Sequence, residues 1–156
     1  WEISEGDAPF PNGSSFNWEL GMPSVVGPPA AASGEQVFGI GLSSDYENLS
    51  NLILRSPVID LTNVERAKMT IQQFLDTSDT EGGQVNVLDE NGEVLYQGDS
   101  LTGLTDGWEE FSLNLTKLPN GEAGVGRKIR LEFRFLSDDV GGDNGAGWYI
   151  DDLQIQ

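Results

Sequence analysis

Cysteine and histidine are both absent from this chain of 156 residues. Without cysteine there is no disulfide, no thiolate nucleophile and no site for a soft metal. Without histidine the chain lacks the commonest general base and the commonest ligand of transition metals. What remains is oxygen, from Asp, Glu, Asn and backbone carbonyls, which is the ligand set of hard cations such as Ca²⁺.

Basic residues are scarce, with 8 Lys and Arg against 26 Asp and Glu, so the formal net charge is −18. Such a field repels nucleic acid and anionic membrane surfaces, and we predict that the chain binds neither. It suits cations, basic partners or neutral ligands. No apolar stretch approaches the roughly 20 residues that span a bilayer, so we expect no membrane insertion.

Length and composition predict one folded domain over residues 1–156. Apolar residues make up 37%, and 20 glycines with 7 prolines indicate many turns. The chain begins at Trp1, without a methionine or a signal peptide. We therefore expect a monomeric module that is excised or processed from a longer protein.

Alternating apolar residues predict β-strands along most of the chain. In RKIRLEFRFL, Ile129, Leu131, Phe133 and Phe135 alternate with charged residues. The runs in GGQVNVLDENGEVLYQ flank a good hairpin turn. LTNVERAKMTIQQFL also fits helical spacing, but we interpret it as a connection followed by a strand. These runs and turns predict an all-β sandwich, with the first thirty residues, rich in Pro, Gly and Ser, wrapping its edge or end.

The last strand, GWYIDDLQIQ, places a carboxylate where an apolar side chain is expected. Strict alternation puts Asp151 on one face with Tyr149, Leu153 and Ile155, the face that is apolar enough to be buried. A buried charge needs a partner. Either Asp151 and Asp152 bind a structural Ca²⁺, or they accept hydrogen bonds from loop N–H groups or an arginine such as Arg55 or Arg130.

Three loops carry further oxygen donors. One holds Asp45, Glu47 and Asn48, which are candidates for binding calcium or a ligand, or form a plain acidic turn. The other two hold Asp76, Asp79 and Glu81, and Asp138, Asp139, Asp143 and Asn144. The last loop directly precedes the final strand, so Asp139 is a candidate to share the metal with Asp151, or the loop is a solvated turn.

Among the aromatic residues, Tyr46, Trp18 and Tyr96 are predicted to be exposed and, with Asn48, to contact a ligand. Trp108 and Trp148 stand at strand starts and are predicted to pack in the core or at its rim. A glycosidase needs two suitably spaced carboxyl groups, but with 26 acidic residues some pair always meets that distance. We therefore predict no catalytic activity.

The motifs together resemble those of MAM-like jelly-roll modules of bacteria. These motifs are WELGMPS, the run from GPPAAASG to SPVIDL, FLDTSDTEGGQVNVLDENG, the tryptophan before FSLNL, and LEFRFLSDD followed by GWYIDDLQI. Such modules are attached to immune-inhibitor-A-type metallopeptidases and include the cleaved-adhesin domains of gingipains. The resemblance runs from about Trp18 to Gln156.

The resemblance implies a two-sheet antiparallel jelly-roll β-sandwich, secreted or at the cell surface, non-catalytic and carried by a larger protein. In MAM-like relatives a Phe-Glu pair in the first strand joins the Asp-Asp of the last strand at a cation site. Trp1-Glu2 matches either that pair or the Gly-Trp segment after it, so Glu2 is a candidate ligand. We expect a calcium-stabilised recognition or adhesion module for a protein surface. The alternatives are an extracellular polysaccharide-binding module and a spacer.

Overall fold

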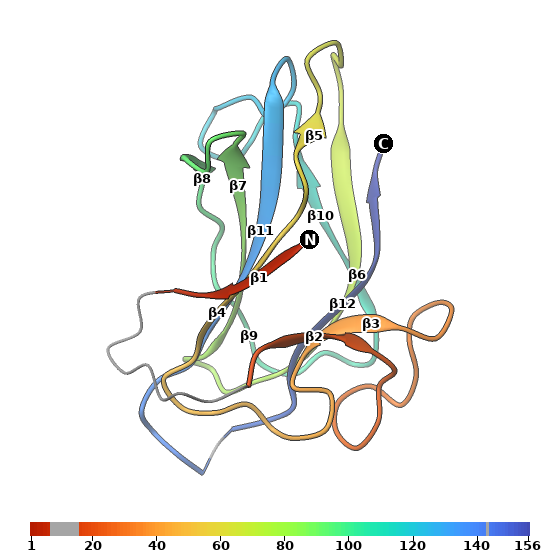
Figure 1. Ribbon diagram of the computed structural model, residues 1–156, viewed down its shortest axis with the longest axis vertical. Coiled ribbons are helices and arrows are strands. Elements are labelled where there is room, and N and C mark those ends of the chain that lie inside the picture. Colours follow the sequence, from red (N-terminus) through yellow and green to blue (C-terminus); the bar gives the residue numbers. More distant parts are fainter. Residues whose placement is uncertain (7–15, 143) are drawn as a thin grey trace.

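The chain folds into two antiparallel β-sheets that pack face to face (Figure 1). This computed structural model describes residues 1–6, 16–142 and 144–156. Within these residues the regular structure is all β-strand and contains no helix, as the sequence predicted. It follows that no helix in the described part of the chain is long and apolar enough to cross a membrane.

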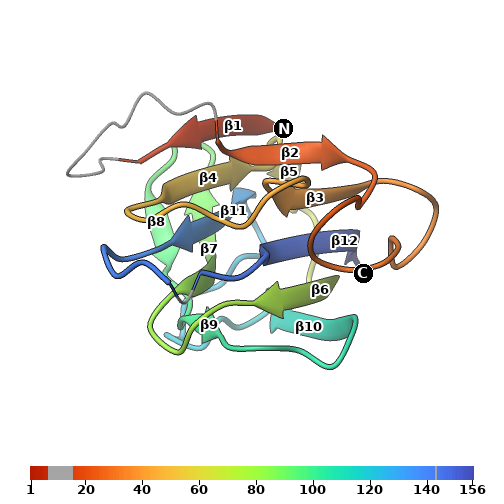
Figure 2. The ribbon, with the colours of Figure 1, turned by 90° about the horizontal axis from the view of Figure 1, so that it is seen from below.

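The first sheet, called sheet A, contains β1 (Glu2–Glu5), β4 (Asn51–Arg55), β5 (Ile59–Asp60), β7 (Gly82–Asp89), β8 (Val94–Tyr96), β9 (Leu101–Thr102) and β11 (Lys128–Leu136). The second, called sheet B, contains β2 (Trp18–Gly21), β3 (Val37–Ile40), β6 (Lys68–Asp76), β10 (Glu109–Asn114) and β12 (Gly147–Ile155). Figure 2 shows the two sheets as two layers.

Strands that are distant in the sequence lie side by side in both sheets. The order in sheet A is β1-β4-β11-β7-β8, with β5 beside β11 and β9 beside β7. The order in sheet B is β10-β6-β12-β3-β2. The chain therefore crosses repeatedly between the layers, which is the jelly-roll form of an antiparallel sandwich and confirms the predicted fold class.

Side chains that alternate along the long strands fill the space between the sheets. The inward residues of β11, Ile129 to Phe135 in steps of two, are fully buried. The predicted hairpin forms between β7 and β8, and at its turn the N–H of Asp89 donates to the carbonyl of Glu93 (2.8 Å). Burying such apolar side chains contributes about 1.5–3 kcal/mol each. The alternation that predicted these strands therefore also predicted which of their faces builds the core.

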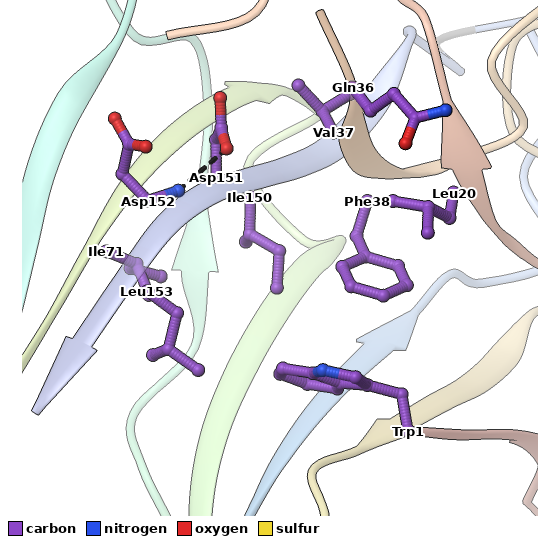
Figure 3. Close-up of a pocket in the computed structure, with 10 residues that line it drawn as sticks. All are labelled: Trp1, Leu20, Gln36, Val37, Phe38, Ile71, Ile150, Asp151, Asp152 and Leu153. Carbon is purple, nitrogen blue, oxygen red and sulfur yellow. Dashed lines mark hydrogen bonds between the residues drawn. The ribbon is translucent and has the colours of Figure 1, made fainter. Parts of the chain in front are cut away.

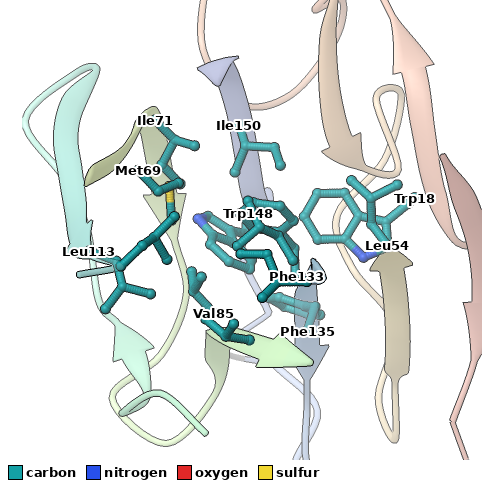
Figure 4. Packing of buried hydrophobic residues seen from close by; sticks show 14 of the residues in the cluster. Trp18, Leu54, Met69, Ile71, Val85, Leu113, Phe133, Phe135, Trp148 and Ile150 are labelled. Atoms are coloured by element: carbon teal, nitrogen blue, oxygen red, sulfur yellow. The ribbon is translucent and has the colours of Figure 1, made fainter. Parts of the chain in front are cut away.

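Trp148 lies at the centre of this core (Figure 4). Its ring centroid is 5.6 Å from that of Trp18 and 5.9 Å from that of Phe133, and its indole N–H donates to Gln73 Oε1 (3.2 Å). Gly83 faces it across the layers, where an added Cβ would come within 2.5 Å of the indole. The core position predicted for Trp148 is confirmed.

β12 contains a β-bulge that reverses the alternation of its side chains. Trp148 and Ile150 face the core before the bulge, and Leu153 and Ile155 pack against the core after it. At the bulge Asp152 has a φ of 48°, in the left-handed region. Because a bulge inserts one extra residue into a strand, the residues that face inward change from even-numbered to odd-numbered.

The predicted burial of Asp151 beside Leu153 is therefore wrong. Asp151 and Tyr149 lie before the bulge, opposite Gln72 and Phe74 of β6. These residues face the outer side of sheet B, where Tyr149 and Phe74 belong to a second, smaller apolar cluster. Asp151 is half-buried there and is not part of the core.

Candidate functional site

The outer side of sheet B is covered by residues 22–34, here called the outer segment. Ser24 Oγ donates to the Leu42 carbonyl (2.8 Å), and the indole N–H of Trp108 donates to the Ala30 carbonyl (2.9 Å). Gly27 lies so close to the Tyr149 ring that a Cβ there would come within 2.4 Å of it. The outer segment and the edge strand β2 thus confirm that the N-terminal region wraps an edge of the sandwich; residues 7–15 of that region lie outside the described residues.

Ser33 at the end of the outer segment holds both carboxylates of the Asp151–Asp152 pair. Its backbone N–H donates to Asp151 Oδ2 (3.1 Å), and its hydroxyl donates to Asp152 Oδ1. The N–H of Asp152 donates to Asp151 Oδ1 (2.7 Å). The sequence left two kinds of hydrogen-bond donor open, loop groups and an arginine, and the structure shows loop donors. The pair fastens the outer segment to the bulge.

The predicted metal ligands do not converge on this pair. Glu2 lies on the outer side of sheet A, where its carboxylate pairs with Arg130 (3.2 Å). Within the described residues, no group of three or more acidic side chains is placed to hold a metal ion. Calcium takes six to eight oxygens, so two carboxylates that already accept hydrogen bonds do not fit a calcium site by themselves.

The other predicted ligands meet at one end of the sandwich, here called the loop end, which comprises residues 41–50, 77–81, 137–142 and 144–146. Asn48 Nδ2 donates to the carbonyl of Asp139 (3.4 Å), and Asn144 Nδ2 donates to Asn48 Oδ1 (2.8 Å). Asn144 Oδ1 is buried and has no hydrogen-bond partner in the described structure. The loop end therefore brings Asn48, Asp139 and the loop of Glu47 together. Asp45 is exposed in the same loop, and Asp143 lies outside the described residues.

A buried carboxylate, Glu81, ties the three loops of the loop end to one another. It is 1% exposed and accepts hydrogen bonds from the Tyr46 hydroxyl, from Ser78 Oγ (3.0 Å) and from the N–H of Asp138 (3.0 Å). Burial raises the pKa of the Tyr46 phenol to about 12, and the hydrogen bond to Glu81 acts in the same direction. The N–H of Val140 holds the pKa of the Asp138 carboxyl below its ordinary value. These hydrogen bonds give Glu81 a structural role, because they connect the three loops.

The residues predicted to contact a ligand through exposed rings are mostly buried. Trp18 and Tyr46 are each 2% exposed and belong to the core, so the prediction of their exposure is wrong. Both face inward because Trp18 packs on Trp148 and Tyr46 packs on Phe135, with ring centroids 5.0 Å apart in the second pair. Tyr96 is half-buried against the core. Asn48 is hydrogen-bonded within the loop end. None of the three aromatic residues presents an open ring face to solvent.

Sequence reasoning missed an apolar pocket of about 200 Å³ between the two sheets (Figure 3). Trp1 stands at its mouth, 46% exposed, with its ring centroid 5.0 Å from that of Phe38. Leu20, Ile150 and Leu153 also line it. The signal in the sequence was the pair of apolar residues at the two edge strands, Trp1 before β1 and Leu20 in β2, which alternation places on the inner side.

The carboxylates that border the pocket point away from its apolar interior. Figure 3 shows Asp151 and Asp152 on the opposite side of β12 from Trp1 and Leu153. Gln36 is the one other polar residue among those that line it. The pocket thus offers an aromatic and aliphatic surface with an acidic border, and within the described residues its lining contains no Lys or Arg.

These features define a class: a jelly-roll β-sandwich module with a small apolar pocket and no convergent set of reactive side chains among the described residues. The fold of the chain is similar to that of solved structures. A cleaved adhesin domain of Lys-gingipain from Porphyromonas gingivalis matches with a TM-score of 0.55 and 16% identity, over 100% of this chain and 89% of that domain. The fold of this chain is therefore that of a cleaved-adhesin-type module, which confirms the resemblance predicted from the motifs.

Two further comparisons match this chain to parts of longer proteins. Bacillopeptidase F of Bacillus subtilis is 32% identical over 145 residues, which are 92% of this chain and 10% of the length of that protein. An exo-β-agarase structure matches over 98% of this chain and 25% of that chain, with 13% identity and a TM-score of 0.54. No protein-family profile matches the sequence.

Proposed function

We propose that this chain is a non-catalytic recognition module that a larger secreted or cell-surface protein carries. The observation that supports it most is one of proportion. The match to Bacillopeptidase F covers 92% of this chain but only 10% of that longer protein. The fold of the chain matches 89% of a cleaved adhesin domain. A sandwich that recurs as a small part of larger chains fits an accessory role outside the cell, with a protein surface as its target.

The test is a binding screen with the isolated chain. Labelled chain is applied to an array of extracellular proteins and, in parallel, to a glycan array, with and without calcium. We expect saturable retention on the protein array at an ionic strength that removes non-specific attraction to the acidic surface. Retention on neither array would leave only the spacer role.

Carbohydrate binding is the second candidate, and one feature favours it. Trp1 is 46% exposed beside Phe38, and half-exposed aromatic rings are the surfaces on which sugar rings stack. The fold also recurs within an exo-β-agarase structure. Retention on the glycan array that Trp1→Ala abolishes would favour this candidate over protein recognition.

Calcium stabilisation is a separate proposal, and the loop end fits it better than β12 does. Asn144 Oδ1 is a buried acceptor without a hydrogen-bond partner in the described structure. Asn144 Nδ2 donates to Asn48 Oδ1, and Asn48 Nδ2 donates to the Asp139 carbonyl. An amide oxygen, nearby backbone carbonyls and carboxylates are the ligand types that calcium takes. A bound ion there would supply the tie between loops that a disulfide supplies in other extracellular modules.

We also propose that the chain catalyses nothing. The buried carboxylate of the loop end, Glu81, accepts hydrogen bonds from three donors, and Asp151 and Asp152 are held by Ser33. Both groups of acids are thus occupied by structural partners and not directed into the pocket. Hydrolysis of chromogenic glycosides or peptides by purified chain, lost on unfolding, would contradict this.

A further inference from the structure

The pocket at Trp1 remains open although it is built from inner faces of the sandwich. Leu20 in the edge strand β2 is 57% exposed, a large fraction for a leucine that alternates with the buried Trp18 and so faces inward. Trp1 packs on Phe38 and Phe133 at one side of the opening. The pocket therefore has the size and surface to receive an apolar side chain from outside.

On this basis we propose that the pocket binds an apolar side chain of an extended, basic segment of a partner protein. This inference rests on the proposed function and names the binding surface and the kind of partner. The segment inserts the apolar side chain between Trp1, Leu20 and Leu153, and its flanking Lys or Arg residues reach the carboxylates that border the pocket.

Charge complementarity selects this occupant. Asp151 and Asp152 border the pocket, its lining in the described structure contains no Lys or Arg, and the whole chain carries a net charge of −18. A second copy of the chain carries the same charge, so self-association through the pocket is opposed by repulsion. An anionic lipid or glycan is opposed for the same reason, whereas a basic segment is attracted.

The direction of the polar groups separates a peptide from a neutral sugar. Sugar hydroxyls need hydrogen-bonding groups that converge on the bound ring, but Asp151 and Asp152 point to the opposite side of β12 (Figure 3). A long Lys or Arg side chain can follow the surface to these carboxylates while its neighbour occupies the pocket.

The experiment titrates the chain with three short fluorescent peptides of equal length. One alternates lysine with leucine, one alternates lysine with serine, and one alternates glutamate with leucine. We expect the lysine–leucine peptide to bind at least about tenfold more tightly than either of the others. Equal binding of the lysine–serine peptide would show attraction by charge alone and would overturn the proposal.

Matched variants locate the site. Leu20→Asn should weaken binding of the lysine–leucine peptide by about tenfold, because Leu20 lines the pocket. Leu104→Asn is the control, since Leu104 is 75% exposed and is not part of the pocket lining. Trp1→Ala should act like Leu20→Asn, and circular dichroism checks that each variant is folded.

The outcomes distinguish this inference from the proposed function. Unchanged peptide binding by Leu20→Asn overturns the assignment of the pocket, while retention of the same variant on a protein array leaves the recognition role standing. A neutral glycan that competes with the peptide, or sedimentation that shows a dimer lost in Leu20→Asn, overturns the choice of occupant. Absence of retention on any array overturns the recognition role itself.

Discussion

At the scale of single residues, the acidic groups of the loop end and of the bulge in β12 are stabilised by hydrogen-bond donors and not by opposite charges. With 8 basic residues for 26 acidic ones, most carboxylates cannot form a salt bridge. Glu81 is buried with three hydroxyl and amide donors, and Asp138 accepts from Val140 N–H (2.8 Å) and Thr80 Oγ1 (3.0 Å). Hydrogen bonds to a charged acceptor contribute more than neutral ones, about 1.5–3 kcal/mol each.

Replacing Glu81 tests this network. Glu81→Ala leaves the donors of Tyr46, Ser78 and Asp138 without their acceptor in a buried site, and we expect it to lower the free energy of unfolding by about 3 kcal/mol or more. Tyr46→Phe removes one of the three donors, together with the oxygen that accepts from the Ser78 N–H (3.4 Å), and should cost less, about 1–2 kcal/mol. Urea unfolding followed by tryptophan fluorescence measures both. Equal costs for the two variants would contradict a shared acceptor.

The lowered pKa of Asp138 gives a second prediction, on pH. A carboxyl whose folded pKa is depressed contributes stability above its unfolded pKa, about 3.9, and that contribution is lost as pH falls through the folded value. Asp138→Asn should therefore be less stable than the wild type at neutral pH, with a difference that shrinks as pH falls below about 4. Urea unfolding of both chains across this range provides the measurement. A stability difference that stays constant with pH would show that the charge of Asp138 does not contribute to stability.

At the scale of elements, β12 is where alternation in the sequence failed. Period two predicted the inward residues of β11 correctly because that strand pairs with β4 and β7 in unbroken register. In β12 the register shifts at the Asp-Asp pair, and a bulge has no strong signature in one sequence. The buried positions of Trp18 and Tyr46 were missed for another reason. Propensity alone does not show that they pack on Trp148 and Phe135, which follow them by many residues.

The bulge makes its own prediction. Asp152 adopts a left-handed φ of 48°, which Asn and Asp tolerate and β-branched residues do not. Asp152→Val should cost about 1–2 kcal/mol more than Asp152→Asn, because both lose the charge, whereas only valine strains the backbone and also removes the oxygen that accepts from the Ser33 hydroxyl. Thermal unfolding of the two variants compares them. A valine variant as stable as the asparagine variant would argue against the bulge.

At the scale of the whole molecule, two sheets and an acidic surface form a module whose loops gather at one end and whose pocket lies between the sheets. The motifs sufficed for the fold, because they mark strands and turns that recur in cleaved-adhesin-type modules. They did not suffice for the pocket, because Trp1, Leu20 and Leu153 come from three distant segments and meet only after folding.

Chelation tests the calcium proposal at this scale. If the loop end holds an ion, exhaustive chelation lowers the melting temperature by several degrees, and calcium but not magnesium restores it. Saturation at a hundred times the dissociation constant contributes about 2.7 kcal/mol. Asn144→Ala, which removes the unpartnered amide oxygen, should no longer respond to chelation, and Asp151→Asn should still respond. No change on chelation would remove calcium from the account.

The central claim, that this chain recognises a basic protein surface through the pocket at Trp1, is tested most directly by one comparison. Wild-type chain, Leu20→Asn and Leu104→Asn are applied to the same array of extracellular proteins, and retention is measured for each. The account predicts saturable retention of the wild type and of Leu104→Asn, with Leu20→Asn weakened by about tenfold. Equal retention of all three chains, or retention of none, would contradict it.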